Sequence, residues 1–417
     1  MILSDYEQAI LSGAIGSLGD NMAMNIVVGA AQMLGATRLI EVVSSHIDGC
    51  LYHGDSGVLF CEELVRRGAK VKVPSTTNVS ALNLLKGNQA RLPPKKLEMA
   101  QRLMDAHDKI GCIPSWTCAP YQAGARPRQG DQIAWGESNA VAFANTVLGA
   151  RTNRYGDFLD IACAISGRAP YYGLHCPENR FADLLIDVSN LPQNLLIEDT
   201  FFPVLGAIIG RAAGESICVV EGLKKGVNED QLKSLCAGAA STGAVGLIHI
   251  SGVTPEAPST QVALDGNPPK QTINVKMDMI KDAIRKLSLA DDGPIDCVAL
   301  GSPHFSTEES RKLLLLTNNT KFKVPVYVCT GRHTMADLRL DGTDVALEKL
   351  GVQFIVDTCV VVTPILPLKA GVMMTNSAKF SHYSMGNTGY LPVFGSLIDC
   401  VKSAQAGRVI LEFGPWK

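Results

Sequence analysis

Short apolar runs rich in Val, Ile and Leu alternate along the chain with segments whose apolar residues recur at helical spacing. The runs are typical of buried strands, and the segments between them are typical of amphipathic helices. Their alternation indicates βα units and largely parallel sheets, so we predict an α/β fold. The expected strands are 38–44, 217–222, 243–251 and 296–301, the expected helices are 57–68, 229–241 and 307–317, and the pattern continues through 323–331, 342–351, 352–359 and 371–379 to a closing helix at 395–407.

The alternation is interrupted once over a long stretch. In residues 251–275, Pro, Gly and Thr break both the strand and the helix periodicity. We therefore predict a linker at 251–275 that separates a larger α/β body, residues 1–255, from a C-terminal α/β subdomain, residues 275–417.

Composition and charge exclude several classes of protein. The 417 residues include 38 Lys plus Arg and 40 Asp plus Glu, and neither sign forms a long block, so nothing predicts capture of nucleic acid or of a membrane surface. No apolar run approaches the roughly 18 residues of a spanning helix, and the N-terminus is acidic where a signal peptide is basic. We expect a small-molecule substrate and a cytoplasmic location.

The twelve cysteines are scattered, which fits a reducing compartment better than a disulfide framework. Most are expected to pack as small apolar residues. The absence of CxxC, HExxH, Walker and GxGxxG motifs disfavours zinc sites, P-loop nucleotidases and dinucleotide folds. Separated thiolates can nevertheless hold an iron–sulfur cluster if they meet in space. The cysteines expected in the core are Cys61, Cys163, Cys218, Cys329 and Cys400.

Residues 44–57 form an irregular segment rich in reactive side chains, directly after a predicted strand. Besides Asp, Ser and Gly, which any surface loop can carry, the segment contains two histidines, a tyrosine and a cysteine. Irregular segments on a rigid scaffold often carry functional sites. We therefore predict a functional loop that contains His46, Cys50, Tyr52 and His53.

Three further segments share this character. Residues 115–157 contain a cysteine, several arginines and the triplet Glu137-Ser138-Asn139 at the expected start of a helix, where unpaired N–H groups can receive an anion. Ordinary capping by the serine or the asparagine explains the same triplet without a ligand. Residues 300–306 and 357–364 follow predicted strands, and ligands of open α/β sheets bind at the carboxyl ends of strands.

Eight ordered strings, among them HIDGCLYHGDSG, TCAPYQ, AWGESNAVAFANTVLGARTNR, GSPHFS, DTCVVVTP and MTNSAKFSHY, resemble the signature blocks of the large catalytic unit of the aconitase X family. The resemblance runs from LSDYEQAILSG almost to the C-terminus. It implies one aconitase-like large unit over residues 1–417, built of several three-layer α/β/α subdomains with mostly parallel sheets.

The resemblance also implies a hydro-lyase with an iron–sulfur cluster that acts as a Lewis acid. Members of the family dehydrate cis-3-hydroxy-L-proline in one branch and mevalonate 5-phosphate in the archaeal branch. The string HIDGCLYHG is closer to the first branch. The expected reaction therefore converts cis-3-hydroxy-L-proline to Δ1-pyrroline-2-carboxylate.

For the cluster, the resemblance implies that Cys118 and Cys359 are ligands. The block that carries a third cysteine in the archaeal branch is Gly301-Ser302-Pro303-His304 in this chain, so that ligand is missing. Either Cys50 supplies the third thiolate, which we prefer, or the hydroxyl of Ser302 lies beside an open iron. Fewer thiolates favour a smaller 2Fe–2S cluster.

For the substrate, the resemblance implies a pocket made by the turn Gly49-Cys50-Leu51, by Asn78 and by Lys379. Lys379 is expected to bind the substrate carboxylate and Asn78 to orient the substrate. A solvated lysine and a turn-capping asparagine are the alternatives without a ligand. Ser138, Asn139 and His53 are expected to form hydrogen bonds around the reacting carbons, and the general base is left open among His46, Tyr52, His53 and Glu137.

The family closes its site with a small swivelling domain, which we expect as a separate subunit. Two other functions stay open at this point. A mevalonate 5-phosphate dehydratase would need cationic donors for the phosphate. A cluster-bearing regulatory or RNA-binding protein is disfavoured by the near-neutral charge and the 6% aromatic content. The candidate phosphate donors are Arg126, Arg128, Arg151 and Arg154.

Overall fold

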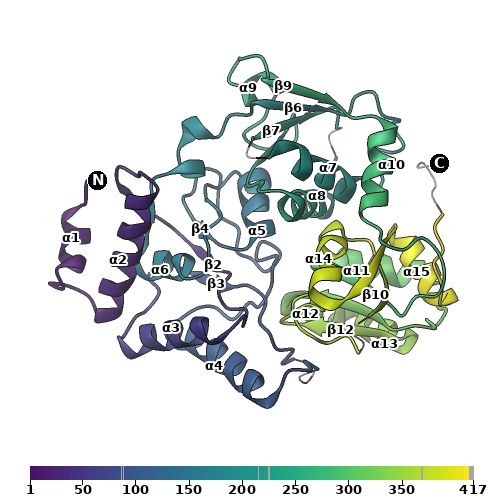
Figure 1. Cartoon of the computed structure of the whole chain (residues 1–417), viewed down its shortest axis with the longest axis horizontal. Coiled ribbons are helices and arrows are strands. Elements are labelled where there is room, and N and C mark those ends of the chain that lie inside the picture. The colour runs from purple at the N-terminus through teal and green to yellow at the C-terminus, as the bar shows by residue number, and fades with distance from the viewer. Residues whose placement is uncertain (86, 88, 215, 224–225, 368–369, 413–417) are drawn as a thin grey trace. The chain divides into compact units, whose positions relative to one another are not determined.

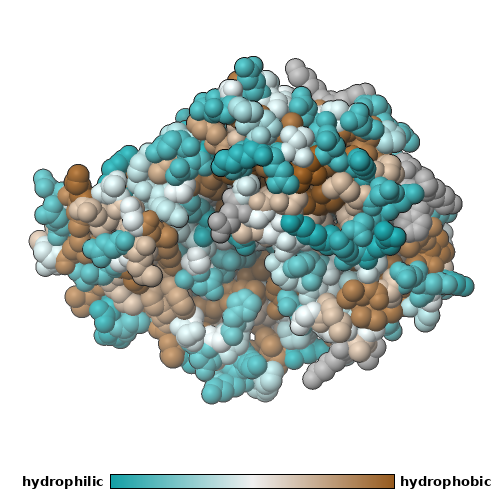
Figure 2. Space-filling view, turned by 45° about the horizontal axis from the view of Figure 1, so that its top comes forward, coloured by the Kyte–Doolittle hydropathy of each residue, from teal (hydrophilic) through white to brown (hydrophobic). Residues whose placement is uncertain are grey.

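The computed structural model describes residues 1–412 apart from 86, 88, 215, 224–225 and 368–369 (Figure 1). The chain forms two compact units, of which the first comprises Met1–Leu82 with Leu92–Phe181 and the second comprises Asn83–Arg91 with Ala182–Lys417. Figure 2 shows one face of the molecule, on which hydrophilic areas alternate with several hydrophobic patches. Within the described ranges, no helix is long and apolar enough to cross a bilayer.

The first unit is built around a parallel three-stranded sheet with the order β3-β2-β4 and an antiparallel ribbon of β1 and β5. Its apolar core lies among the helices that pack around these strands. The predicted strand 38–44 is shorter than expected, because the chain leaves the ribbon after Glu41 and enters the three-stranded sheet at Ser45. The elements are α1 (Asp5–Leu11), α2 (Leu18–Met33), β1 (Leu39–Glu41), β2 (Ser45–Ile47), α3 (Asp55–Arg66), β3 (Ser75–Thr77), α4 (Pro94–Ile110), β4 (Ala134–Trp135), α5 (Ser138–Phe143), the π-helix η1 (Ala144–Leu148), α6 (Leu159–Ser166), β5 (Arg168–Pro170) and the 3-10 helices η2 (Gly173–His175) and η3 (Pro177–Asn179).

The second unit begins with a parallel four-stranded sheet of order β8-β7-β6-β9. The segment 251–275, expected to be a linker, contains β9, which pairs along its whole length with β6. This strand is polar and mostly exposed, so it lacks the apolar pattern that identifies buried strands. The boundary between the compact units lies earlier, after Phe181. The elements are β6 (Leu184–Asp187), α7 (Phe201–Ala213), β7 (Cys218–Glu221), α8 (Glu229–Thr242), β8 (Ile248–Ile250), α9 (Thr260–Ala263), β9 (Gln271–Asn274) and α10 (Met277–Lys286).

A second parallel sheet in this unit has five strands in the order β12-β11-β10-β13-β14. Successive side chains of a strand point to opposite faces of the sheet, and here Val298 belongs to one apolar cluster and Ala299 to another. Both faces of this sheet are therefore buried against apolar residues. The predicted α/β fold with mostly parallel sheets is confirmed. The elements are β10 (Cys297–Phe305), α11 (Thr307–Leu316), β11 (Val326–Thr330), α12 (Arg332–Asp341), α13 (Thr343–Leu350), β12 (Val352–Val356), β13 (Gly371–Thr375), α14 (Ala378–Thr388), β14 (Tyr390–Phe394) and α15 (Leu397–Ala406).

Helices α7 and α8 pack closely because small residues face each other between them (Figure 1). A Cβ atom on Gly206 would lie 2.2 Å from the carbonyl oxygen of Leu235, which is backbone and cannot move aside. We expect Gly206→Ala to lower the free energy of unfolding by about 3 kcal/mol. Gly386 in α14 has no atom within 4 Å of such a Cβ, so Gly386→Ala should raise the free energy by about 0.5–1 kcal/mol. Urea titration checks both values, and equal effects would contradict the packing argument.

Candidate active site

Three segments with reactive side chains meet at one edge of the first unit's sheet. Strands β2, β3 and β4 are parallel, so their carboxyl ends lie together. The turn 48–51 follows β2, Asn78 follows β3, and Glu137 follows β4. The loop with Cys118 joins them, because Thr117 N donates to the carbonyl oxygen of Thr77 over 3.2 Å. The structure thus brings these residues of the predicted site together.

The turn after β2 is held by a buried carboxylate. Asp160, at the start of α6, accepts hydrogen bonds from the backbone N–H groups of Asp48 and Gly49, at 2.7 Å and 3.2 Å. Asp48 Oδ1 in turn accepts from Asn78 Nδ2 at 2.5 Å. Burial and the nearby Asp48 raise the pKa of Asp160 to about 7, against the opposing effect of its N–H donors. Sequence reasoning missed Asp160, although an acidic residue in the otherwise apolar helix LDIACAIS was a usable signal.

Cys50 has the surroundings of a protonated thiol. The side chain is 1% exposed, and Sγ lies 3.1 Å from the carbonyl oxygen of Asn78 and 3.3 Å from that of Ile47, either of which can accept from the one S–H group. Burial, followed by the negative charges of Asp48 and Asp160, raises the pKa of Cys50 well above its usual range. A cluster ligand must be a thiolate. These contacts argue against the preferred assignment of Cys50 as the third ligand.

Cys118 is 7% exposed and is tied to α5 through Asn139. The Nδ2 atom of Asn139 donates to the carbonyl oxygen of Cys118 and to the hydroxyl of Tyr121, both at 3.2 Å. The Tyr121 ring stacks on Phe143 with a centroid distance of 3.6 Å, which fixes the hydroxyl. Asn139 and Cys118 therefore form one rigid part of the strand edge.

Several buried polar atoms at this edge have no hydrogen-bond partner among the described residues. Most buried polar groups in proteins are paired, so such atoms indicate a place for a bound ligand or water. The side chains concerned come from the ends of β2, β3 and β4 and from α5. The atoms are His46 Nε2, Asn78 Oδ1, Trp135 Nε1 and Asn139 Oδ1.

The Glu-Ser-Asn triplet caps α5 through its glutamate. Glu137 Oε2 accepts from Ala140 N at 2.6 Å, and Ser138 Oγ donates to Glu137 Oε1 at 3.4 Å. The N-cap residue of α5 is thus Glu137, whereas the alternative without a ligand named Ser138 or Asn139. The Glu137 carboxylate accepts from an N–H group that a bound anion would otherwise use. The expected anion site at this helix start is therefore not supported by the geometry.

The four candidate bases have different surroundings. His46 is fully buried, its Nδ1 lies 2.8 Å from Thr76 Oγ1, and burial lowers its pKa to about 4. Glu137 is 4% exposed. Tyr52 donates its hydroxyl to Asp55 Oδ1 at 2.8 Å, and His53 is exposed. The structure places two of the candidates in the buried strand edge and two in the loop before α3.

Buried neutral histidines make the protein sensitive to acid. Burial lowers the pKa of His175 to about 3, and Tyr155 and Gln132 hold its two ring nitrogens. Below about pH 6.5 the unfolded histidine binds a proton that the folded one does not, so the free energy of unfolding falls with falling pH, by up to about 1.4 kcal/mol per unit. His175→Gln should reduce this slope by that amount. Urea titrations between about pH 6 and 4.5 measure it, and an unchanged slope would contradict the assignment of a neutral ring.

A second strand edge gathers the predicted residues of the second unit. Strands β10, β12 and β13 are parallel members of one sheet, with Ser302 near the end of β10, Cys359 after β12 and Lys379 after β13. Ser377 Oγ donates to the carbonyl oxygen of Ser302. His304 Nε2 donates to the carbonyl oxygen of Thr358 at 3.2 Å. Ser302, Cys359 and Lys379 thus belong to one connected edge.

Lys379 is close enough to His304 for its positive charge to act on the imidazole ring. Burial is the largest cause that lowers the pKa of His304 to about 3, and the positive charges of Lys233 and Lys379 add to the effect. Lys379 lies in the first turn of α14 and is half-buried. A half-buried cation at a strand edge is suited to hold an anionic group.

The loop with Cys359 is rigid. Asp357, which starts it, is fully buried with a φ of +71°. Arg332 holds the Asp357 carboxylate with two hydrogen bonds, Nε to Oδ1 at 2.5 Å and Nη2 to Oδ2 at 3.0 Å. Thr363 N donates to the carbonyl oxygen of Cys359 at 3.1 Å, and Cys359 is 8% exposed. Sequence reasoning missed Arg332, which is 25 residues away from Asp357.

Cys118 belongs to the first unit, whereas Cys359, Ser302 and Lys379 belong to the second. A cluster bound by both thiols therefore remains a prediction. Across the residues that the structure describes, no three His, Cys, Asp or Glu side chains form a ready group of metal ligands. The candidate phosphate donors Arg126, Arg128 and Arg154 are exposed, and Arg151 is half-buried.

Several known proteins are similar to this chain over nearly its whole length. It is 39% identical to a cis-3-hydroxy-L-proline dehydratase of Pseudomonas aeruginosa, with 99% of this chain and 72% of the relative covered. It is 34% identical to the phosphomevalonate dehydratase large subunit of Methanocaldococcus jannaschii, with 96% and 100% covered. The crystal structure of Thermococcus kodakaraensis aconitase X in its holo-form has a TM-score of 0.87 at 31% identity and covers 97% of this chain and 100% of that one.

Family models match the chain in three consecutive segments. They are described as the aconitase X first, second and third domains and match residues 1–178, 182–285 and 295–406. The first match ends close to the boundary between the two compact units after Phe181. The chain belongs to the aconitase X family.

Proposed function

We propose that this chain is the large, catalytic part of a hydro-lyase that converts cis-3-hydroxy-L-proline to Δ1-pyrroline-2-carboxylate. The observation that carries the proposal is an identity of 39% and 40% with two curated cis-3-hydroxy-L-proline dehydratases, over 99% and 97% of this chain. The phosphomevalonate dehydratase large subunits in the comparison reach 34%. All these relatives are named dehydratases, so the reaction class does not depend on the choice of substrate.

The orientation of two buried amides supports an imino acid substrate. Asn78 presents Nδ2 to Asp48, where it donates to Oδ1. The carbonyl of Cys118 requires the same of Asn139. Both Oδ1 atoms are left buried without a partner among the described residues. They suit the ring N–H groups of hydroxyproline better than the oxygens of a phosphate, which mainly accept hydrogen bonds.

The donor set fits an iron–sulfur cluster. Cys118 and Cys359 are buried thiols at the carboxyl edges of parallel sheets, and thiolates are the preferred ligands of such clusters. Because Cys50 is engaged as a donor, we assign the third position to the hydroxyl of Ser302, and two thiolates favour a 2Fe–2S cluster. When bound, the cluster supplies a Lewis acid that polarises the departing hydroxyl or the carboxylate.

The chain's own residues bind and orient the substrate. Lys379 holds the carboxylate with a charge-assisted hydrogen bond. Asn78 and Asn139 accept from the ring nitrogen, and Asp48, which directly precedes the turn residues 49–51, fixes Asn78 by accepting from its Nδ2 atom. His46 and Glu137 remain the candidate bases for the Cα proton, because both are buried at the strand edge. Loss of the 3-hydroxyl gives an enamine that tautomerises to the product without a redox partner.

A separate small subunit completes the proposed enzyme. The archaeal relatives are named large subunits, and this chain covers 100% of the one from M. jannaschii. It covers 72% and 69% of the two hydroxyproline dehydratases, which therefore carry further sequence in the same polypeptide. We also place the enzyme in the cytoplasm, because twelve buried cysteines suit a reducing compartment.

Turnover of two substrates tests the proposal. The chain is co-purified with its small subunit, reconstituted anaerobically with iron and sulfide, and supplied with cis-3-hydroxy-L-proline or mevalonate 5-phosphate. We expect Δ1-pyrroline-2-carboxylate from the first and no product from the second. Turnover of the phosphate ester alone would replace the proposed substrate, and turnover of neither, with a fully loaded cluster, would refute the proposed function.

A further inference from the structure

Helix α8 contributes a buried lysine that the proposed reaction does not use. The side chain of Lys233 is 2% exposed. Its Nζ atom contacts Asp230 Oδ1 at 2.8 Å, Glu309 Oε2, and the carbonyl oxygen of His304 at 3.2 Å. Burial opposes the charge, but the carboxylates of Glu309 and Asp230 outweigh it and raise the pKa of Lys233. A buried ion cluster of this kind is costly to form, so its position in the fold is informative.

The cluster is attached to the end of β10. Lys233 donates to the carbonyl oxygen of His304. Asp230 Oδ2 accepts from Ser306 Oγ at 2.7 Å, and Glu309 Oε2 accepts from Ser306 N at 2.8 Å. Each of the three charged side chains therefore holds the backbone or the side chain of residues 304–306.

The same stretch is held at its other end by α14 and β11. Ser377 Oγ donates to the carbonyl oxygen of Ser302. Gly301 has a φ of +91°, and a Cβ atom there would lie 2.0 Å from the carbonyl oxygen of Cys329. The segment 301–306, here called the Ser302 turn, includes the irregular end of β10, where the strand register shifts between Leu300 and Phe305. It is held by Gly301 and Ser377 on one side and by the ion cluster on the other.

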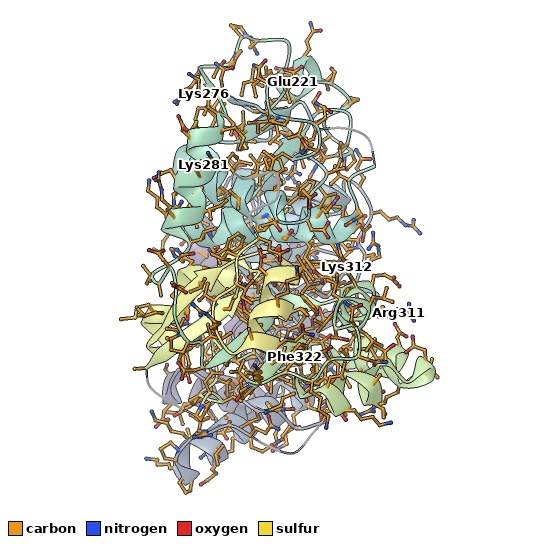
Figure 3. All side chains as sticks on the ribbon, turned by 90° about the vertical axis from the view of Figure 1, so that its right-hand side faces the viewer. Glu221, Lys276, Lys281, Arg311, Lys312 and Phe322 are labelled. Carbon is orange, nitrogen blue, oxygen red and sulfur yellow. The ribbon has the colours of Figure 1, made fainter. Side chains whose placement is uncertain are left out.

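Ser302 itself lies next to unfilled space. A cavity of about 30 Å³ is lined by Lys233, Ser302, Glu309 and Ser377, among others. Glu309 also lines a larger cavity of about 220 Å³, together with Lys312, which Figure 3 labels on the same helix α11. Packing therefore does not fill the space beside Ser302, which leaves the backbone contacts on either side of it as its main restraint.

We propose that Lys233, together with Asp230 and Glu309, positions Ser302 for the dehydration. Lys233 is a positioning residue, because it contacts the turn and not the reacting atoms. The inference rests on the proposed function for the role of Ser302 beside the cluster. The placement of the turn by the ion cluster can be measured without the reaction.

An engineered thiol at position 302 reports the placement of the turn. In the full chain carrying Ser302→Cys, freed of iron by a chelator, iodoacetamide labelling of each cysteine is followed by peptide mass spectrometry. The test variant adds Lys233→Met with Glu309→Gln. This pair removes the lysine together with one of its two carboxylate partners, so that the lysine is not replaced while both carboxylates stay buried. Lys233→Arg is the conservative variant. The control, Lys270→Met with Asp183→Asn, removes an ion pair of the same unit in which Lys270 is exposed and Asp183 is half-buried.

We expect labelling at position 302 to be at least tenfold faster in the double variant and intermediate with Lys233→Arg, while Cys359 changes less than twofold. The control at Lys270 and Asp183 should leave both rates unchanged. An unchanged rate at position 302, or equal increases at 302 and Cys359 that indicate general loosening, would overturn the proposal. If the double variant does not fold, Lys233→Arg carries the test. With Ser302 in place, Lys233→Arg should lower kcat more than it changes KM. If no variant and no wild-type enzyme turns over substrate, that result counts against the proposed function, and the labelling rates still test the positioning role of Lys233.

Discussion

Replacing Cys118 or Cys359 by alanine is expected to remove most of the bound iron and to lower dehydratase activity by at least about a thousandfold. A Lewis acid stabilises the departing hydroxyl by several kcal/mol, and each 1.4 kcal/mol corresponds to about a factor of ten in rate. Iron content, near-ultraviolet and visible absorbance after anaerobic purification, and turnover of cis-3-hydroxy-L-proline measure the effect.

Matched controls come from core cysteines of each unit. Cys163 in α6 and Cys400 in α15 are fully buried, so alanine there should cost about 1–2 kcal/mol of stability while iron is retained. Cys50→Ala decides the third ligand. Its thiol donates to carbonyl groups, so we expect iron to stay bound. Iron loss in Cys50→Ala would restore Cys50 as a ligand, and full iron in Cys118→Ala or Cys359→Ala would remove the basis of the proposed site.

Lys379→Met is expected to lower kcat/KM for cis-3-hydroxy-L-proline by about 10²- to 10³-fold. Loss of one partner of a desolvated charge pair costs about 2–5 kcal/mol, because the other charge is left unpaired. Lys379 is half-buried beside the edge that holds Ser302 and Cys359, so its removal would leave the substrate carboxylate without its proposed partner. Steady-state kinetics give the ratio, and iron analysis of the same samples shows that the cluster is intact.

Two further variants sharpen this test. Lys349 in α13 is exposed, so Lys349→Met should leave kcat/KM within a factor of two. Lys379→Arg keeps the charge and should restore part of the activity. Wild-type kcat/KM in Lys379→Met would show that the lysine does not bind the substrate, and a parallel loss of iron would assign it a role in holding the cluster.

Much of the succession of helices and strands could be predicted from the apolar pattern of the chain. The helices predicted at 229–241 and 307–317 are observed at Glu229–Thr242 and Thr307–Leu316, because amphipathic periodicity marks the face that must be buried. The strand β9 at Gln271–Asn274 was missed, since an exposed edge strand carries no such pattern. A strand that is exposed on both faces needs no apolar residues, so its sequence shows no hydrophobic periodicity.

The candidate site was only partly accessible in the same way. The end of a predicted strand located Cys359, because polar residues that follow apolar strands lie at a sheet edge. Cys118 was located in an irregular segment, and Asn78 came only from the resemblance to the aconitase X family. The supporting residues Asp160, Lys233 and Arg332 were missed. Asp160 binds the turn from 112 residues away, and Lys233 binds Glu309 from 76 residues away. A single charged residue in a helix is usually solvated, so only its spatial neighbours reveal such a role.

The amino-acid sequence by itself determined the α/β class, the succession of helices and strands, and the resemblance to the aconitase X family, because these depend on local periodicity and on ordered motifs. Only the tertiary structure showed that Cys50 Sγ lies beside the carbonyl oxygens of Ile47 and Asn78, that the Oδ1 atoms of Asn78 and Asn139 have no partner among the described residues, and that a buried lysine donates to the carbonyl oxygen of His304. A protonation state or an amide orientation depends on the charges and hydrogen-bond partners within a few ångströms, and folding brings these together from distant parts of the chain.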